Sequence, residues 1–449
     1  MSFILLLAVL GVVGYRLTSP EDRARYLVIA MGFVRRLKVA AVEPGPEYES
    51  FRDALRARTR RALVTPALVA VNVIVVGGML FGAHAIGDSN TLVAWGASLG
   101  SRTTNGEWWR LVTSTFVHTG TLHLLVDVAV LIQLGAVLER LAGRLAFTGV
   151  YLSAGAFATL VSLSSRPVAV TEGASGAIFG LYGLLFATLI WQLFQRRRED
   201  LTPDPDESAE SSRDTRLTIP LIAMKRLGAG AAVFLVYSAL SGLAHAAELG
   251  GLVVGLAYGL VLARRVSEKE PDPHHVGAAM VATVVIAVAC AMPLRNIADV
   301  TPEITRVLAT EERTVAAYQS AYDAFKRQRT TAEALAQLAE RIIVPELQAA
   351  DVRLKALVNI PPEHQALVAD AREYVRLRCA SWSARADAIR KANADPREAR
   401  GATATASRRL HGEARFRSNL TAMGKAESTE RASLEVFQRI RRPARSPPE

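Results

Sequence analysis

Two stretches of this chain carry residues that could do chemistry together. "TEGASGAIFG", residues 171 to 180, places Ser175 among small residues, and "SGLAHAAELGGLVVGLAYG", residues 241 to 259, places His245 and Glu248 one helical turn apart. A serine hydroxyl is a weak nucleophile unless an adjacent base takes its proton. If the two stretches meet, His245 or Glu248 could be that base, and Ser175 could attack a carbonyl carbon.

A third stretch, "WWRLVTSTFVHTGTLHLLVDVAVL", adds His118, His123 and Asp127. A charged side chain at the centre of a bilayer costs about 2.5 to 3.5 kcal/mol on insertion scales, so a polar residue inside a span is a functional candidate. Asn72 and His84 lie in another apolar run and are interpreted as interhelical hydrogen-bonding or interfacial groups.

The composition indicates two regions of different class. Of the 449 residues 50% are hydrophobic, yet the last third is charged and polar. Apolar runs of about 18 residues can span a bilayer as helices. Such runs predict an all-α polytopic membrane bundle, and they lie near residues 62–87, 122–142, 145–163, 174–195, 227–243, 244–263 and 276–294.

The N-terminal segment, residues 1–61, combines a short apolar run with basic residues. Residues 1–15 are marginal in length for a span, and a signal peptide is the alternative. Because the run lacks a basic segment before it and a clear small-residue cleavage site, we expect a retained anchor followed by a basic cytoplasmic segment.

The net charge of +11 is better explained by membrane topology than by nucleic acid. Eleven Lys and Arg residues lie in 16–61 and more lie in 196–226, whereas the loop 88–110 is poor in them. Positive charge stays on the cytoplasmic side. We therefore expect 16–61 and 196–226 inside, 88–110 outside, and no nucleic-acid partner. The same rule predicts an integral protein of the plasma (inner) membrane whose residues 295–449 lie outside the cytoplasm.

Two regions flank or interrupt the predicted bundle. The segment 196–226 contains "RRREDLTPDPDESAESSRDTR", which is too poor in apolar residues to fold and predicts a disordered cytoplasmic loop. An additional span is expected within 265–294. Residues 295–449 show amphipathic spacing and good helix formers, which predict a helical hairpin or short coiled-coil module with a disordered tail, "RRPARSPPE". The pattern does not identify a partner for this module.

Cysteine usage excludes two kinds of site. The two cysteines, Cys290 and Cys379, form no metal spacing and cannot make a disulfide framework. We predict neither a metal nor a cofactor.

Glycine spacing predicts which spans meet. Small-residue stripes let helix backbones approach closely in lipid. Ser175 directly precedes one stripe, and Glu248 lies three residues before the other and on the same face, so Glu248 is expected to face Ser175. His245 is offset by roughly 60 degrees and lies one turn nearer the outer surface. The two stripes are Gly176, Gly180 and Gly183, and Gly251, Gly255 and Gly259.

The order of these motifs over residues 62 to 264 resembles the rhomboid family of intramembrane serine proteases. The likeness rests on "GEWWR", the two spaced histidines, "GASG" at the head of a span, and "AELGGLVVG". It implies a six-helix membrane core, here with a seventh span, and a substrate that is the transmembrane segment of another membrane protein.

The resemblance also implies roles for individual residues. Ser175 would attack the scissile carbonyl, and its backbone N–H would form the oxyanion hole with the side chain of His123. His118 matches a supporting histidine. The remaining supporting positions are Trp109, Arg110, Gly173, Gly176, Gly251 and Gly255.

Two positions depart from the family pattern. Asp127 stands where the family has an asparagine beside the oxyanion, and Glu248 stands where it has its base histidine. An ionised Asp127 would repel the developing negative charge, although a buried protonated acid could still donate. Glu248 could act as the base, or His245 could turn toward Ser175 with Glu248 orienting it.

Four interpretations of these residues are considered. The first is a rhomboid-type protease that uses Ser175 with Glu248 or His245. The second is a rhomboid-like pseudoprotease that binds transmembrane helices without cutting them. In the third, Ser175 is only a small packing residue. A proton-coupled transporter would need interrupted helices in inverted repeats, and the sequence shows none.

Overall fold

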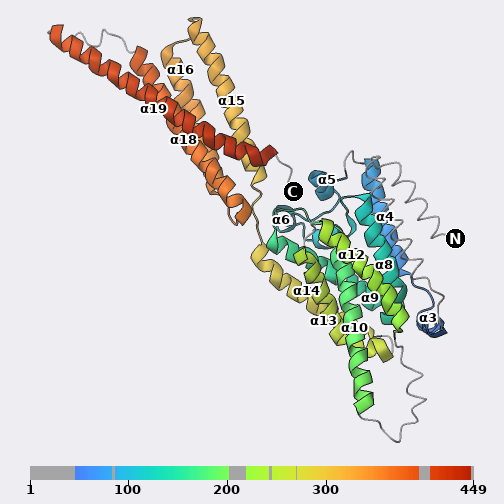
Figure 1. The fold of residues 1–449 in the computed structure, drawn as a ribbon. Helices are drawn as coiled ribbons and strands as arrows, with labels where there is room; N and C mark the ends of the chain where they lie inside the picture. Colours follow the sequence, from blue (N-terminus) through green and yellow to red (C-terminus); the bar gives the residue numbers. More distant parts are fainter. Residues whose placement is uncertain are drawn as a thin grey trace. The chain divides into compact units, whose positions relative to one another are not determined.

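The computed structural model describes residues 46–82, 86–201, 219–241, 245–268, 271–393 and 405–445. The predicted anchor 1–15, His84 and the centre of the predicted loop 196–226 lie outside the described residues. Contacts divide the chain into two compact units, Met1–Arg295 and Asn296–Glu449 (Figure 1). Each unit is described by itself.

Unit 1 is built from apolar helices. Within the described residues, six are long and apolar enough to cross a membrane. The apolar part of α13 (His245–Glu268), Ala246–Leu262, is shorter. The predicted all-α polytopic bundle is confirmed. The six long helices are α4 (Val64–Gly82), α8 (Thr121–Ala142), α9 (Arg144–Ser165), α10 (Ser175–Leu201), α12 (Leu221–Ser241) and α14 (Pro273–Ala291).

Shorter helices fill the connections of unit 1. The segment α3 (Pro46–Arg58) buries Phe51 and Leu55 in the apolar core of the bundle. The connection from α4 to α8 contains α5 (Ser89–Ala94), α6 (Gly100–Thr103), α7 (Arg110–Thr113) and the 3-10 turn η1 (Ser114–Phe116). The turn η2 (Met292–Leu294) follows α14.

The ends of the predicted disordered loop 196–226 are helical, which corrects that prediction at both edges. The α10 helix continues to Leu201, and α12 begins at Leu221 after Pro220. Proline is well suited to the first turn of a helix because it lacks the N–H that would have no intrahelical partner there. Residues 202–218 lie outside the described part of the chain.

A buried carboxylate fixes the start of α4. Glu139 of α8 accepts hydrogen bonds from the backbone N–H groups of Leu63, Val64 and Thr65 at 2.6, 2.8 and 2.8 Å. These N–H groups have no partner within the helix, and a negative charge at a helix N-terminus is favourable. Asn72 of α4 is buried and donates to the Leu68 carbonyl of the same helix, and its predicted interhelical hydrogen bond stays a prediction.

The two glycine stripes meet, as the sequence predicts. A Cβ atom on Gly251 would overlap the carbonyl oxygen of Gly176, and one on Gly255 would overlap that of Gly180. The backbones of α10 and α13 therefore touch without intervening side chains, and α9 packs against both helices. This contact brings the stretch around Glu248 to the first turn of α10.

We expect Gly255→Ala to destabilise unit 1 by about 1 to 3 kcal/mol, because the added methyl must push two backbones apart. Thermal unfolding in detergent micelles would measure the change. The matched control is Gly277→Ala on α14, where a Cβ atom would meet nothing within 4 Å. Equal unfolding temperatures for the two variants would contradict the close approach of α10 and α13.

Unit 2 is also helical where it is described. Its core contains Tyr374, Trp382 and Leu347, and the buried Arg378 pairs with Glu311 at 2.8 Å and with Glu430 at 3.1 Å. The predicted disordered tail is corrected in part, because its first residues, 441–445, continue the last helix. The helices are α15 (Thr301–Lys326), α16 (Ala332–Leu338), the π-turn η3 (Ala339–Ile343), α17 (Val344–Lys355), α18 (Pro362–Asn393) and α19 (Thr405–Arg445).

Candidate active site

Ser175 is the first residue of α10, and the loop before it is held at three points. Thr171 pairs with Ser98 in an isolated β-bridge, with N···O distances of 2.8 and 2.9 Å. Gly173 donates its N–H to the Ser114 carbonyl at 2.9 Å. The Ala174 N–H donates to Asp127 Oδ2 at 3.1 Å. These contacts fix the backbone of residues 171–174, directly before Ser175.

Gly173 is required by both its conformation and its neighbour. Its φ of +99° is a backbone conformation that side-chain-bearing residues rarely adopt. A Cβ atom there would lie 2.7 Å from Cε1 of His123. The imidazole of His123 therefore packs directly against the loop that ends at Ser175.

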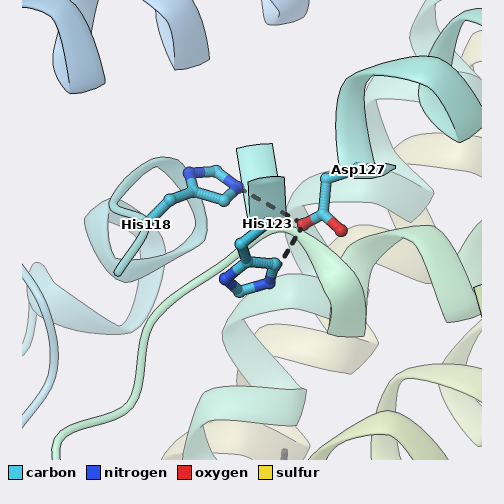
Figure 2. A group of neighbouring side chains, drawn as sticks. All are labelled: His118, His123 and Asp127. Carbon is cyan, nitrogen blue, oxygen red and sulfur yellow. Dashed lines mark hydrogen bonds and ion pairs between the residues drawn. The ribbon is translucent and has the colours of Figure 1, made fainter. Parts of the chain in front are cut away.

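The structure brings His118, His123 and Asp127 together (Figure 2). Nε2 of His118 lies 3.3 Å and Nε2 of His123 lies 3.6 Å from Oδ2 of Asp127. All three side chains are buried, and their ligand-type atoms lie within 4.8 Å of one another. Glu172, which the sequence analysis did not single out, lies with its Oε2 3.5 Å from Nδ1 of His123. This cluster surrounds the carboxylate that receives the Ala174 N–H.

Glu248 is buried on α13 beside the first turn of α10. The carbonyl oxygen of Ala247, the preceding residue, would lie 3.9 Å from a Cβ atom on Gly176. The hydroxyl of Ser238 on α12 donates to Glu248 Oε1. Within the described residues, no hydrogen bond joins the Ser175 hydroxyl to Glu248. The side chain of His245 lies outside the described residues, so its predicted role stays a prediction.

Ser238 is a site residue that sequence reasoning missed. Its only signal in the sequence is that it is a polar residue in an apolar span, and α12 shows no stripe that points to α13. Glu172 was missed as well. It lies in the "TEGASG" motif, but its contact with His123 depends on how the loop folds.

Trp109 and Arg110 organise the loop region before α8. The buried guanidinium of Arg110 donates to the carbonyls of Val93 and Ala97, the latter at 2.9 Å, and pairs with Glu107 at 2.5 Å. It also lies 4.5 Å from the centroid of the Trp109 ring. The hydrogen bond from Arg110 lowers the pKa of Glu107 below its ordinary value. Through these contacts Arg110 links the segment around Val93 and Ala97 to Glu107 and Trp109.

The N-terminus of α10 can stabilise negative charge. The first N–H groups of a helix have no intrahelical acceptor, and the helix dipole adds positive potential there. Within the described hydrogen bonds, the N–H of Ser175 has no acceptor. An oxyanion formed next to the Ser175 hydroxyl could therefore receive this N–H, and the His123 side chain lies on the adjoining loop.

Comparison with known proteins places this site in a family. Residues 105–265 match the Rhomboid domain. This part of the chain belongs to the rhomboid family. Together with the six apolar helices, the match shows an integral, multi-pass membrane protein. The rhomboid domain includes Trp109, Ser175 and Glu248, and with them every other residue that the sequence analysis assigned to the site.

Several relatives share parts of the rhomboid domain. Rhomboid protease GluP of Bacillus subtilis is 41% identical over 98 residues, which are 22% of this chain and 19% of that protein. Putative rhomboid protease YdcA of the same organism is 41% identical over 87 residues, which are 19% of this chain and 44% of that protein. RHOMBOID-like protein 5 of Arabidopsis thaliana is 29% identical over 175 residues, which are 38% of this chain and 49% of that protein. This chain therefore spans less than half the length of each of these relatives.

Proposed function

We propose that the rhomboid domain is an intramembrane serine endopeptidase that hydrolyses a peptide bond in or near a transmembrane segment of another membrane protein. Ser175 is the nucleophile, and Glu248 is the base. The observation that carries this assignment is the backbone contact of α10 with α13, which sets Ala247 beside Gly176 and so brings Glu248 next to the turn that begins with Ser175. The protease names of GluP and YdcA agree with it.

The proposed reaction follows the logic of acyl transfer by an activated serine. The proton of the Ser175 hydroxyl passes to the Glu248 carboxylate as Oγ attacks the scissile carbonyl carbon. The resulting oxyanion receives the Ser175 N–H and the side chain of His123. The C–N bond then breaks, Glu248 returns the proton to the leaving amine, and water hydrolyses the acyl-serine by the reverse proton path. Ser238 fixes the orientation of the Glu248 carboxylate by donating to it.

The carboxylate of Asp127 is unfavourable for this reaction. It accepts the N–H of Ala174, the residue before Ser175. A donor aimed at an oxyanion is typically worth about 10²- to 10³-fold in rate, and a negative charge at that place works against the transition state.

We therefore expect Asp127→Asn to speed cleavage by up to about 10²-fold, because the amide can accept from Ala174 and also donate to the oxyanion. Both proteins are first treated with a chelator, so that no bound metal ion contributes to the difference. Initial rates with a fluorescent single-span substrate in detergent would measure it. Asp272→Asn, at the exposed N-cap of α14, is the control for loss of one carboxylate. A slower Asp127→Asn enzyme would show that the carboxylate assists the reaction.

A second candidate function is binding of transmembrane helices without cleavage. The observation that favours it is the replacement of imidazole by Glu248, whose carboxylate is held by Ser238 on α12. A base that is engaged elsewhere leaves the serine hydroxyl a weak nucleophile. The membrane-embedded partner would be the same in both functions.

Labelling with a fluorescent fluorophosphonate tests the proposed function. We expect the wild-type protein to carry the label on Ser175, located by mass spectrometry of the digested protein, and Ser175→Ala to carry none. Ser165→Ala, which removes an exposed hydroxyl at the end of α9, should label like the wild type. An unlabelled wild-type protein that still binds a single-span peptide would support the second candidate.

For the location we also propose the plasma (inner) membrane, with unit 2 outside the cytoplasm. The support is the alternation of basic segments along the chain, which orients membrane proteins.

A further inference from the structure

The cluster beside Ser175 contains buried polar atoms that lack hydrogen-bond partners. Among the described side chains these are both ring nitrogens of His123, Nδ1 of His118, Oδ1 of Asp127 and Oε2 of Glu172. The four side chains are at most 5% exposed. Burying a polar atom without a partner is unfavourable, so a group of them in one place indicates an unseen partner.

The spacing of the cluster suits a metal ion. A tetrahedral ion with ligand distances of about 2.0 to 2.2 Å holds its ligand atoms about 3.3 to 3.6 Å apart. Oδ2 of Asp127 lies 3.3 Å from Nε2 of His118 and 3.6 Å from Nε2 of His123. The three atoms belong to different side chains, and both imidazoles approach the same carboxylate oxygen of Asp127 (Figure 2).

The surroundings of these atoms have the form of a metal site's outer shell. A ligating histidine usually turns its other ring nitrogen to a carboxylate or carbonyl, which fixes the ring. Nδ1 of His123 lies 3.5 Å from the Glu172 carboxylate, while Nε2 points to Asp127. Asp127 in turn accepts the Ala174 N–H at 3.1 Å, as ligating carboxylates commonly do.

The charges also balance. Asp127 and Glu172 bring two carboxylates that are at most 5% exposed close together, and an uncompensated buried charge is strongly unfavourable. A divalent cation would neutralise both carboxylates while the two imidazoles remain neutral, which is the form that binds metal.

We propose that Nε2 of His118, Nε2 of His123 and a carboxylate oxygen of Asp127 bind one divalent transition-metal ion, with Glu172 orienting His123. Two imidazoles and one carboxylate suit Zn²⁺ and its neighbours rather than Mg²⁺ or Ca²⁺, which prefer oxygen ligands. Three protein ligands leave the fourth position of such an ion to water. The site does not depend on Ser175 being a nucleophile. In the metal-bound form both ring nitrogens of His123 are engaged, so His123 donates to an oxyanion only in metal-free protein.

The proposed metal site departs from the prediction of no metal made from the sequence. That prediction rests on cysteine spacing, whereas the proposed site uses histidine and carboxylate ligands. His118 precedes α8 and His123 lies in its first turn, so only the fold of the connecting segment brings their rings face to edge, with centroids 5.0 Å apart.

The experiment measures zinc in the full chain, purified in detergent without a histidine tag. The protein is stripped with a chelator, loaded with Zn²⁺ and washed, and its metal content is read by atomic emission. We expect one Zn²⁺ per chain in the wild type, retained in the presence of excess Mg²⁺. Asp127→Asn and His118→Gln should lose it. Glu172→Gln should weaken zinc affinity by about 10- to 100-fold, the usual effect of removing an outer-shell carboxylate.

Controls separate this site from casual binding and from misfolding. His274 and His275 are exposed on α14, and their joint replacement by alanine should leave one Zn²⁺ bound. Each variant is also tested for its helical circular dichroism and elution volume. The binding is independent of catalysis, so it is read equally well in Ser175→Ala. Any of three results would overturn the proposal. The folded wild type could bind no zinc, the folded Asp127→Asn variant could retain its zinc, or the variant that lacks His274 and His275 could lose it.

Discussion

Replacing Ser175 by alanine is expected to reduce cleavage of a single-span substrate by at least about 10³-fold, because removing the nucleophile of an acyl-transfer site leaves only binding and oxyanion contacts. The alanine side chain fits the first turn of α10, where Ser175 is half-buried. The assay uses purified protein and a labelled substrate in the same proteoliposomes, with products separated on a gel and their ends mapped by mass spectrometry.

The control for Ser175→Ala is Ser164→Ala, which removes an exposed hydroxyl that donates only to the Val161 carbonyl within α9. It should cleave at the wild-type rate. If Ser175→Ala cleaved as fast as the control, the products would come from another nucleophile or from a contaminating protease, and Ser175 would be a packing residue.

Replacing Glu248 by glutamine is expected to cost about 10³- to 10⁴-fold in cleavage rate, since the amide keeps the size of the side chain and cannot take the Ser175 proton. The hydroxyl of Ser238 can still donate to the amide oxygen, so the local packing is preserved. The same proteoliposome assay reads the loss, and equal elution volume and unfolding temperature show that the variant is folded.

Two further variants, one at Ser238 and one at Glu248, help to interpret the result. Ser238→Ala removes the partner that orients Glu248 and should slow cleavage by only about tenfold, as expected of a positioning residue outside the reacting atoms. Glu248→His installs imidazole. A gain of cleavage in Glu248→His from a wild type that does not cut would favour the binding function over the protease.

The sequence predicted the helix contact well because a glycine stripe is a local pattern with a direct physical consequence. Where side chains are absent, two backbones can touch, and Gly251 and Gly255 do meet the carbonyls of Gly176 and Gly180. The orientation of α10 against α13 follows from spacing within each stretch, and no knowledge of the loops is needed.

The surroundings of the site were less predictable because they depend on segments that are distant in the chain. Glu248 meets Ser238 of α12, and Glu172 meets His123 only because the loop before α10 folds back on Ser98 and Ser114. A sequence pattern ranks such residues no higher than any other serine or glutamate. His245 lies one turn before Glu248, and its side chain is outside the described residues.

Unit 2 shows the same limit in another form. Its amphipathic spacing predicted helices, and helices are present. The spacing did not predict the end of α15, after which Gln328 has a φ of 56°, or the π-turn at residues 339–343 that interrupts the following helix. It also could not predict that Arg378 is buried between Glu311 and Glu430, since three distant segments make that network.

A double-mutant cycle on the cleavage rate tests most directly whether Ser175 and Glu248 act as one unit. Rates are compared for the wild type, Ser175→Ala, Glu248→Gln and the double variant, in the same proteoliposomes. Groups that act together are strongly non-additive, so we predict that the double variant is no slower than either single variant. Losses that multiply in the double variant, or a wild type no faster than the double variant, would contradict a catalytic pair of serine and glutamate.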